Sequence, residues 1–300
     1  METYHIPVLL KASVDKLVHN PGGTYADATF GGGGHSREIL SRLNDGGRLV
    51  AFDRDADAIE NSPADKRFTL VNHNFRFMKQ FMDYLKCTPA DGILADLGIS
   101  SHQIDVPLRG FAHRLAGPLD MRMDKNSSLT AAKIINEYSE KELYLMFRNY
   151  GEIPNASKLS RHICQQRLSR KIESSDDFKH MIEPCTPKHQ SAKYLSQVYQ
   201  ALRIEVNGEL TALKTLLETS PDILKKGGRL VIISYHSLED RMVKNFLQTG
   251  NISGEKQSDL YGNIIRPFEP EGGNGIVPDE AETLANRRAR SARMRIGVRK

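Results

Sequence analysis

Four consecutive glycines at positions 31–34 constrain the fold of this chain more than any other feature. They follow an apolar segment at residues 25–30 and precede a helical pattern in which Ile39, Leu40 and Leu43 share one face. A strand, a glycine turn and a helix in this order bring the backbone close to a nucleotide-like ligand. The sequence therefore predicts an α/β fold with a ligand at this turn. A tight turn without a ligand is the alternative, because glycine serves both purposes.

The first hundred residues alternate between short apolar runs and helical patterns. This alternation is typical of a parallel sheet flanked by helices. We expect strands near residues 25–29, 48–52, 68–72 and 92–97. The next convincing strand, residues 229–235, follows a gap far longer than one crossover needs. The sequence therefore predicts a sheet domain that is interrupted by a mainly helical insertion.

Helix signals are strong inside this gap. Ser139 and Glu142 have the spacing of a capping box, and an apolar face and Gly151 follow them. A second helix is expected at residues 158–171, which carry five Lys or Arg and no acidic residue. RNA contact and simple solvation both explain such a basic face. An apolar stripe through residues 195–217 then predicts helical structure that returns the chain to the sheet.

The net charge of +5 is concentrated at one end of the sequence. Residues 287–300 hold seven Arg or Lys and no acid, which leaves 35 basic and 37 acidic residues elsewhere. Such a patch can neutralise phosphates, so a nucleic acid is a reasonable partner. A solvated tail is the alternative. The alternation at residues 292–296 also fits a final strand with its arginines outward.

Composition argues against several other classes of protein. The three cysteines, Cys87, Cys164 and Cys185, lie far apart and suggest neither a disulfide framework nor a zinc cluster. No apolar run approaches the roughly 18 residues that cross a bilayer, and the first residues do not resemble a secretory leader. We therefore expect a cytoplasmic protein that does not enter the membrane.

Polar residues follow the expected strands at the edge where ligands of open α/β sheets bind. Asp53 ends the second strand about 20 residues after the glycines, where a carboxylate can accept hydrogen bonds from both ribose hydroxyls. Asn72 ends the third strand and Asp96 the fourth. The glycine turn lacks the G-x-G-x-x-G spacing of nicotinamide sites and the lysine of phosphate-binding loops. A nucleotide-like cofactor other than NAD or ATP is therefore favoured.

Several longer blocks carry a resemblance to a known family. They are FGGGGHS at 30–36, FDRD at 52–55, DLGISS at 96–101, RGF at 109–111, GPLDMRMD at 117–124, YQALRIEVNGEL at 199–210, SYHSLEDRMVK at 234–244 and RARSARMR at 288–295. In these blocks the chain resembles the RsmH (MraW) methyltransferases, which modify the exocyclic N4 amine of a cytosine in 16S ribosomal RNA. The resemblance implies a Rossmann-like class I methyltransferase sheet.

By this resemblance the cofactor is S-adenosylmethionine. Its expected contacts are Gly33, Gly34, His35, Asp53, Phe75, Asp96 and Gln103. The glycines and His35 suit the methionine end, Asp53 the ribose, and Phe75 the adenine face. Asp96 and Gln103 offer polar groups near the reacting end.

The resemblance also implies the extent of each domain. A methyltransferase domain would span residues 1–106 and 204–300, and residues 107–203 would form the helical insertion. Such an insertion usually covers the cofactor cleft and helps to hold RNA. The implied partner is 16S ribosomal RNA within the small ribosomal subunit. The sequence leaves open whether the substrate is naked RNA or the assembled subunit, and whether the protein forms a homodimer.

The cytosine amine is a poor nucleophile because its lone pair is conjugated with the ring, so an enzyme must orient it and accept its proton. No metal is needed for this reaction. Asp96, Ser100 and Ser101 follow the fourth strand and are the candidate acceptors. Both serines are equally suited to cap the next helix. Tyr235 and the histidine after it follow the fifth strand and can border the target base.

Four alternatives accompany this interpretation. Pro184 and Cys185 resemble the nucleophile dipeptide of cytosine carbon-5 methyltransferases, although they lie in the insertion. The acidic and histidine side chains near residues 236–240 and 120–124 can be imagined as metal ligands, but loop hydrogen bonding explains them better. The chain can also be an RNA-binding ribosome assembly factor without catalysis, or more remotely a nicotinamide oxidoreductase.

Overall fold

The computed structural model describes residues 7–300, which form two compact units. Within these residues, the sheet unit comprises 7–98 and Leu210–Lys300, and the helical unit comprises Ile99–Glu209. The predicted boundaries lay at 106/107 and 203/204, so the structure assigns more of the chain to the helical unit. The reason is packing: Ile99 and Val206 both belong to the apolar core of that unit. No helix within residues 7–300 has the length and apolar character needed to cross a bilayer.

The sheet unit is built on seven strands in the order β3-β2-β1-β4-β5-β7-β6. The first five strands in this order pair in parallel, and β7 runs antiparallel between β5 and β6. The order reverses between β1 and β4, which is the switch point where open α/β sheets bind ligands. The strands are β1 Thr24–Asp27, β2 Arg48–Phe52, β3 Phe68–Val71, β4 Ala90–Asp96, β5 Leu224–Ser234, β6 Phe268–Ile276 and β7 Arg293–Arg299.

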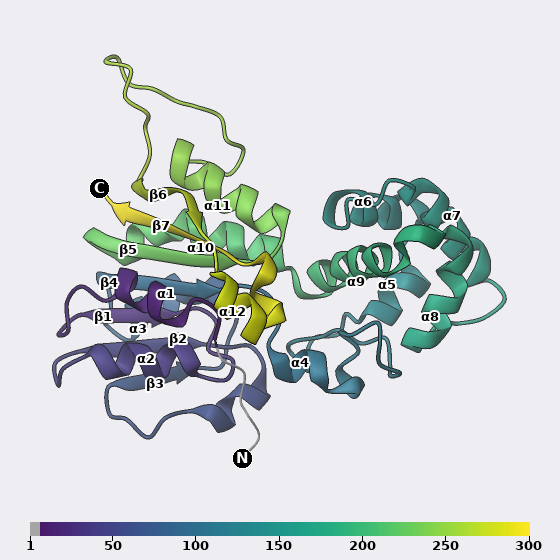
Figure 1. The fold of residues 1–300 in the computed structure, drawn as a ribbon, viewed down its shortest axis with the longest axis horizontal. Coiled ribbons are helices and arrows are strands. Elements are labelled where there is room, and N and C mark those ends of the chain that lie inside the picture. The colour runs from purple at the N-terminus through teal and green to yellow at the C-terminus, as the bar shows by residue number, and fades with distance from the viewer. Residues whose placement is uncertain (1–6) are drawn as a thin grey trace. The chain divides into compact units, whose positions relative to one another are not determined.

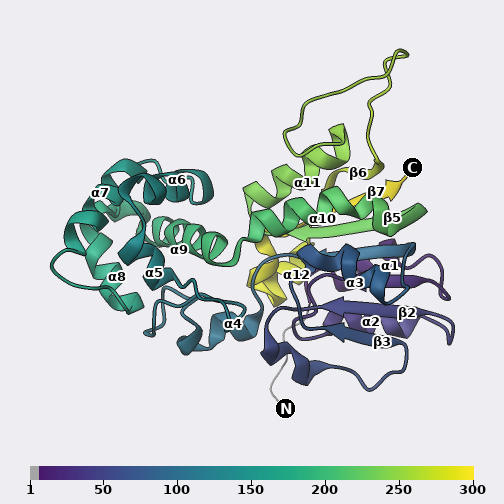
Figure 2. The same cartoon turned by 180° about the vertical axis from the view of Figure 1, so that it is seen from behind.

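Helices cover both faces of this sheet (Figures 1 and 2). One face is covered by α1 (Leu10–Leu17) and α2 (Gly34–Arg42). The opposite face is covered by α3 (Met78–Tyr84), α10 (Glu209–Ile223) and α11 (Ser237–Thr249). In β4, Ile93 and Ala95 belong to the apolar core under α3, α10 and α11, and Leu94 belongs to the core under α1 and α2. Successive side chains of a strand point to opposite faces, which explains this division. The predicted α/β sheet is therefore confirmed.

The helical unit contains α4 to α9. Its helices are α4 Ser101–Asp105, α5 Ala131–Glu137, α6 Glu140–Tyr150, α7 Ala156–Gln166, α8 Ser175–Ile182 and α9 Ser191–Asn207. The predicted capping box begins α6: Ser139 Oγ accepts from Glu142 N at 3.3 Å, and Glu142 Oε2 accepts from Ser139 N at 2.7 Å. The predicted basic helix is shorter than expected. Arg167 follows it and donates to the carbonyls of Ile135 and Tyr138, so this guanidinium closes α5.

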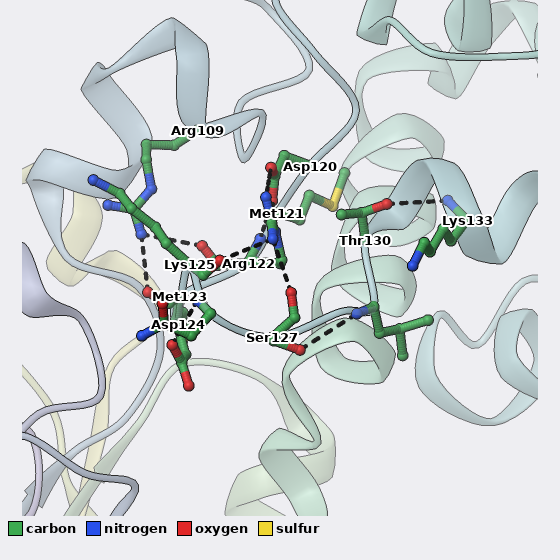
Figure 3. Close-up of polar contacts among 12 residues, drawn as sticks. Arg109, Asp120, Met121, Arg122, Met123, Asp124, Lys125, Ser127, Thr130 and Lys133 are labelled. Atoms are coloured by element: carbon green, nitrogen blue, oxygen red, sulfur yellow. Dashed lines mark hydrogen bonds and ion pairs between the residues drawn. The ribbon is translucent and has the colours of Figure 1, made fainter.

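A loop that precedes α5 is fixed by two polar side chains. The Arg122 guanidinium holds both carboxylate oxygens of Asp120 and the carbonyls of Lys125 and Ser127 (Figure 3). Asn207, at the end of α9, donates to the Met121 carbonyl at 2.8 Å. Its side-chain oxygen accepts from the backbone N–H of Met123 at 2.9 Å. The loop therefore has a defined conformation within the helical unit.

The C-terminal segment is a strand inside the sheet. The expectation of outward arginines is wrong for Arg295, which is only 7% exposed. Its guanidinium forms two hydrogen bonds with the Asp240 carboxylate of α11, at 2.6 and 3.0 Å. Because α11 covers this face of the sheet, an arginine there is buried and needs a charged partner.

Candidate functional site

Acidic and aromatic side chains gather at the carboxyl edge of the parallel strands. Asp27 ends β1, Asp53 follows β2, Asp96 ends β4 and Tyr235 follows β5. Because β1, β2, β4 and β5 run in the same direction, their carboxyl ends lie at one edge of the sheet. The sequence predicted this edge as the ligand site. Within the sheet unit, the structure brings the predicted residues His35, Asp53 and Asp96 to it.

Asp53 is joined to the glycine turn. Its Oδ2 accepts from Gly31 N at 2.7 Å, and its Oδ1 accepts from Asp55 N at 2.9 Å. Burial raises the pKa of Asp53 to about 6, against the lowering effect of these two hydrogen bonds. Gly31 has a φ of 51°, and a side chain added there would meet nothing within 4 Å. The Asp53 carboxylate therefore lies next to open space at the glycine turn.

The two glycines predicted to contact the cofactor, Gly33 and Gly34, are required for different reasons. Gly33 has a φ of 75°, a left-handed conformation that favours glycine, and it precedes α2. A Cβ on Gly34 would lie 2.1 Å from the Pro7 ring, so this glycine admits the N-terminal segment against α2. The side of Gly34 that a side chain would occupy is filled by protein. Any contact of Gly34 with a cofactor must therefore be made by its backbone.

Asp96 is held by two hydrogen bonds and has His35 as a neighbour. Its backbone N–H donates to Thr29 Oγ1 at 2.7 Å, and Tyr235 Oη donates to its Oδ1 at 2.7 Å. The other carboxylate oxygen lies 3.7 Å from His35 Nδ1, and the side chain remains 21% exposed. Burial raises the pKa of Asp96 to about 7, although the Tyr235 hydrogen bond opposes this shift. The group can therefore gain and lose a proton near neutral pH.

His35 lies in the interior rather than on an open surface. The residue is 5% exposed, and its Nε2 lies 3.2 Å from the Val8 carbonyl. Burial lowers the pKa of this imidazole, so the neutral form is favoured. A neutral ring that donates to Val8 from Nε2 turns an unprotonated Nδ1 towards Asp96.

Asp27 belongs to the same cluster and was missed by the sequence analysis. It is fully buried, accepts from Ser36 Oγ at 2.7 Å and from Thr29 N at 3.1 Å, and its pKa is raised by burial. The available signal was its position, because it ends β1 immediately before the glycine turn. The strand-end rule that selected Asp53 and Asp96 selects Asp27 as well.

Phe75 follows β3 and is half-buried. It opens a short 3₁₀ turn, Phe75–Phe77, whose first N–H groups are capped when Asn74 Oδ1 accepts from Arg76 N at 3.0 Å. The ring packs against the core on the face that α3 covers. Part of the residue remains exposed at the carboxyl edge.

The remaining predicted residues lie in the helical unit. Ser100 is the N-cap of α4: its Oγ accepts from Gln103 N, and Gln103 Oε1 accepts from Ser100 N, both at 3.2 Å. The alternative helix-capping role is therefore confirmed for Ser100, and the buried Gln103 completes the capping box. Ser101 begins α4, and its side chain lies outside the described residues.

The alternative sites are explained by structure. Cys185 is 3% exposed, and burial raises the pKa of its thiol, which disfavours a nucleophilic thiolate. Glu239 Oε2 accepts from Tyr235 N at 3.0 Å, and Asp240 pairs with Arg295. Loop and helix hydrogen bonding, which the sequence analysis preferred, is confirmed for both acids.

The comparison with known families decides the class of the protein. The model of the MraW methylase family matches residues 2–300. The chain belongs to the MraW methylase family. This membership covers nearly the whole chain, so it includes both the sheet unit and the helical unit.

Relatives of this MraW family member have high identity over their full length. A Bacteroides fragilis (strain YCH46) protein named "Ribosomal RNA small subunit methyltransferase H" is 51% identical over 298 residues, which are 99% of this chain and 98% of the relative. A Cytophaga hutchinsonii protein of the same name is 52% identical over 298 residues, 99% of each chain. The resemblance stated from the sequence is thereby confirmed. The Rossmann-like strand order agrees with the methyltransferase class.

Proposed function

We propose that this protein transfers a methyl group from S-adenosylmethionine to the exocyclic N4 amine of a cytosine in 16S ribosomal RNA. The names of its full-length relatives support a ribosomal RNA of the small subunit as substrate. One observation carries the chemistry: a carboxylate with a pKa of about 7, Asp96, ends the central strand β4 and keeps an exposed surface. The protein would act in the cytoplasm, on RNA within the small ribosomal subunit.

The residues at the carboxyl edge fit S-adenosylmethionine. The Asp53 carboxylate uses one lone pair of each oxygen for the backbone and keeps others for ribose hydroxyls. The space beside Gly31 admits a ligand close to the backbone, and Phe75 offers a flat apolar surface for adenine. When bound, the cofactor supplies a methyl group on a positively charged sulfur. Nearby carboxylates favour such a cation.

The chain's own residues must deal with the proton of the amine. As the nitrogen gains the methyl group, the bond between carbon and sulfur breaks and the nitrogen loses one proton. Asp96 in its charged form accepts that proton through its Oδ2, because Tyr235 already donates to Oδ1. His35 Nδ1 lies 3.7 Å from Oδ2, beyond hydrogen-bond distance, so this oxygen is left for the substrate. Tyr235 is thus the positioning residue for Asp96.

The pH dependence tests this assignment. Four titratable groups face Asp96: Tyr235 after β5, His35 of α2, Glu239 of α11 and Asp27 of β1. Below a pKa of about 7 the carboxyl is protonated and cannot accept a proton, so the rate of methyl transfer should rise as the pH passes that value.

Replacing Tyr235 with phenylalanine should move this rise to higher pH. The lost hydrogen bond stabilises the charged form of Asp96, and such a bond is worth about 1.5 kcal/mol, or roughly one pH unit. The single-turnover rate of methyl transfer is measured at about five pH values between pH 5.5 and pH 9. Tyr261→Phe is the control, because Tyr261 is 90% exposed. If the rate of Tyr235→Phe rose over the same pH range as that of the parent protein, the role of Tyr235 would be contradicted.

Asp53→Asn should weaken the binding of S-adenosylmethionine by about 10- to 100-fold, because hydrogen bonds to a charged group are worth about 1.5 to 3 kcal/mol. Calorimetric titration measures this affinity. A thermal melt of the same sample checks that the turn at Gly31 has kept its structure. Asp45→Asn is the control, since that carboxylate is 95% exposed. Equal affinity in Asp53→Asn and the parent protein would remove Asp53 from the site.

The direct test combines labelled S-adenosylmethionine with unmethylated 16S RNA and, separately, with unmethylated small subunits. Transfer to subunits is the expected result. Binding of the cofactor without transfer to either substrate would favour the assembly-factor alternative. No binding of the cofactor at millimolar concentration would contradict the proposal.

A further inference from the structure

The basic C-terminal segment divides into two parts with different roles. Arg293, Arg295 and Arg299 lie in β7, and each side chain has protein partners. Arg293 donates to the Asn274 carbonyl, Arg295 binds Asp240, and Arg299 donates to the carbonyls of residues 221 and 267. These three arginines are explained by the fold. The charge of Arg295, which is buried and bound to Asp240, is not available to a partner.

The other three arginines of the segment lie in the 3₁₀ turn Arg287–Ser291, which precedes β7. Arg287, Arg288 and Arg290 are all exposed, whereas Ala289 and Ala292 are buried in the core beneath α1 and α2. Asn286 caps this turn by accepting from the backbone N–H of Arg288 at 3.1 Å. The turn is therefore an anchored element with its arginines directed outward, which argues against a solvated tail.

The sheet register places this turn at the candidate site's edge. Arg293 pairs with Ser234, the last residue of β5. Because β7 runs antiparallel to β5, the residues that precede Arg293 lie at the carboxyl end of β5, beside Tyr235. The helix before the turn, α12 (Glu280–Ala285), contacts the N-terminal segment through Glu282 Oε1, which accepts from Leu9 N at 2.6 Å. The three arginines thus lie on the same edge of the sheet as Asp96.

Two acidic side chains near this turn, at the start of α12, are held by backbone groups. Asp279 caps the helix by accepting from the backbone N–H of Glu282, and the Glu282 carboxylate is bound to Leu9 N. Within residues 7–300, the structure gives neither Arg287 nor Arg290 a side-chain hydrogen bond or ion pair. Exposed guanidinium groups on an anchored turn are suited to bidentate contact with phosphate.

We infer that Arg287, Arg288 and Arg290 form a phosphate-binding surface that holds the RNA backbone next to the target cytosine. The inference rests on the proposed function, since it names where the same RNA is held. Contacts with phosphates position a nucleic acid without reading its sequence. The surface should therefore contribute affinity and salt dependence rather than choice of base.

The test is a triple variant, Arg287→Gln, Arg288→Gln and Arg290→Gln, in the full chain. Its affinity for an unmethylated 16S RNA transcript is measured between 50 and 300 mM salt, roughly the range in which phosphate contacts are resolved. Each lost contact reduces the slope of log affinity against log salt by about 0.7, so a reduction of about 2 is expected. Affinity at low salt should fall at least about tenfold. Binding of S-adenosylmethionine should stay unchanged.

The matched control replaces Arg48, Lys86 and Lys226 with glutamine. All three are exposed cations of the sheet unit, and Arg48 and Lys226 lie at the opposite, amino end of β2 and β5. The control removes the same charge and should leave the slope nearly unchanged. Equal losses in both triple variants would show a general effect of net charge and overturn the inference.

Two further outcomes separate this inference from the proposed function. If the parent protein methylates RNA and the triple variant of Arg287, Arg288 and Arg290 binds the transcript with parental affinity, the phosphate-binding surface alone is overturned. If the triple variant lost affinity only for assembled subunits and not for the transcript, the arginines would contact a ribosomal protein. That result would also overturn the inference. A parent protein that methylates no RNA contradicts the proposed function itself.

Discussion

Asp96→Asn is expected to lower the rate of methyl transfer by about 10²- to 10⁴-fold, the usual contribution of a general base. Asparagine keeps the size of the side chain, and its amide oxygen can still accept from Tyr235 Oη. It cannot take up the proton of the amine. The affinity for S-adenosylmethionine should stay within about tenfold of the parent value. Single-turnover transfer to RNA, together with calorimetric titration, separates the two effects.

Ser100→Ala is the informative companion variant. Ser100 is also a candidate acceptor, but its Oγ caps α4. Loss of a serine cap costs about 1 kcal/mol of stability, so the rate in Ser100→Ala should remain close to that of the parent protein. A large loss in Ser100→Ala combined with an active Asp96→Asn would move the acceptor from the sheet edge to α4.

Asn207→Ala is expected to destabilise the helical unit by about 3 kcal/mol or more. The Asn207 side chain binds the Met121 carbonyl, the Met123 N–H and the Arg203 carbonyl, and the residue is buried. Each backbone group that loses its partner in the interior costs about 1 to 3 kcal/mol. The loop that the Arg122 guanidinium organises (Figure 3) should open together with these bonds.

Hydrogen exchange of the backbone measures this effect region by region, which suits a chain of two units. Residues 117–130 and the end of α9 should lose protection, whereas strands β1 and β4 should keep theirs. Asn126→Ala is the control, because Asn126 is exposed in the same loop. Unchanged protection at Met121 and Met123 in Asn207→Ala would contradict the proposed role of Asn207.

The sheet and the position of the site followed from short-range patterns. The strands β1 to β4 were predicted from apolar runs because a parallel strand is covered on both faces. Asp53 and Asp96 were selected because polar residues at the carboxyl ends of such strands meet at one edge. The same rule would have found Asp27. The capping role of Ser100 was also predictable, since Gln103 follows at capping-box spacing.

Other features depend on contacts between distant segments. Gly34 is a glycine because Pro7 packs against it, and no local pattern predicts that contact. Arg295 is buried because α11 supplies Asp240, so the alternation of polar and apolar residues gave the wrong face. The unit boundary at Gly98 reflects the packing of Ile99 into the helical core. The positioning role of Tyr235 required the 2.7 Å hydrogen bond to Asp96 to be seen.

The most direct test of the central claim identifies the methylated nucleoside. Unmethylated small subunits are incubated with the protein and labelled S-adenosylmethionine, and the RNA is digested to nucleosides and analysed by mass. The account predicts label in N4-methylcytidine with the parent protein and almost none with Asp96→Asn. Label on carbon-5 of cytosine, on ribose or on protein would contradict the account, as would full transfer by Asp96→Asn.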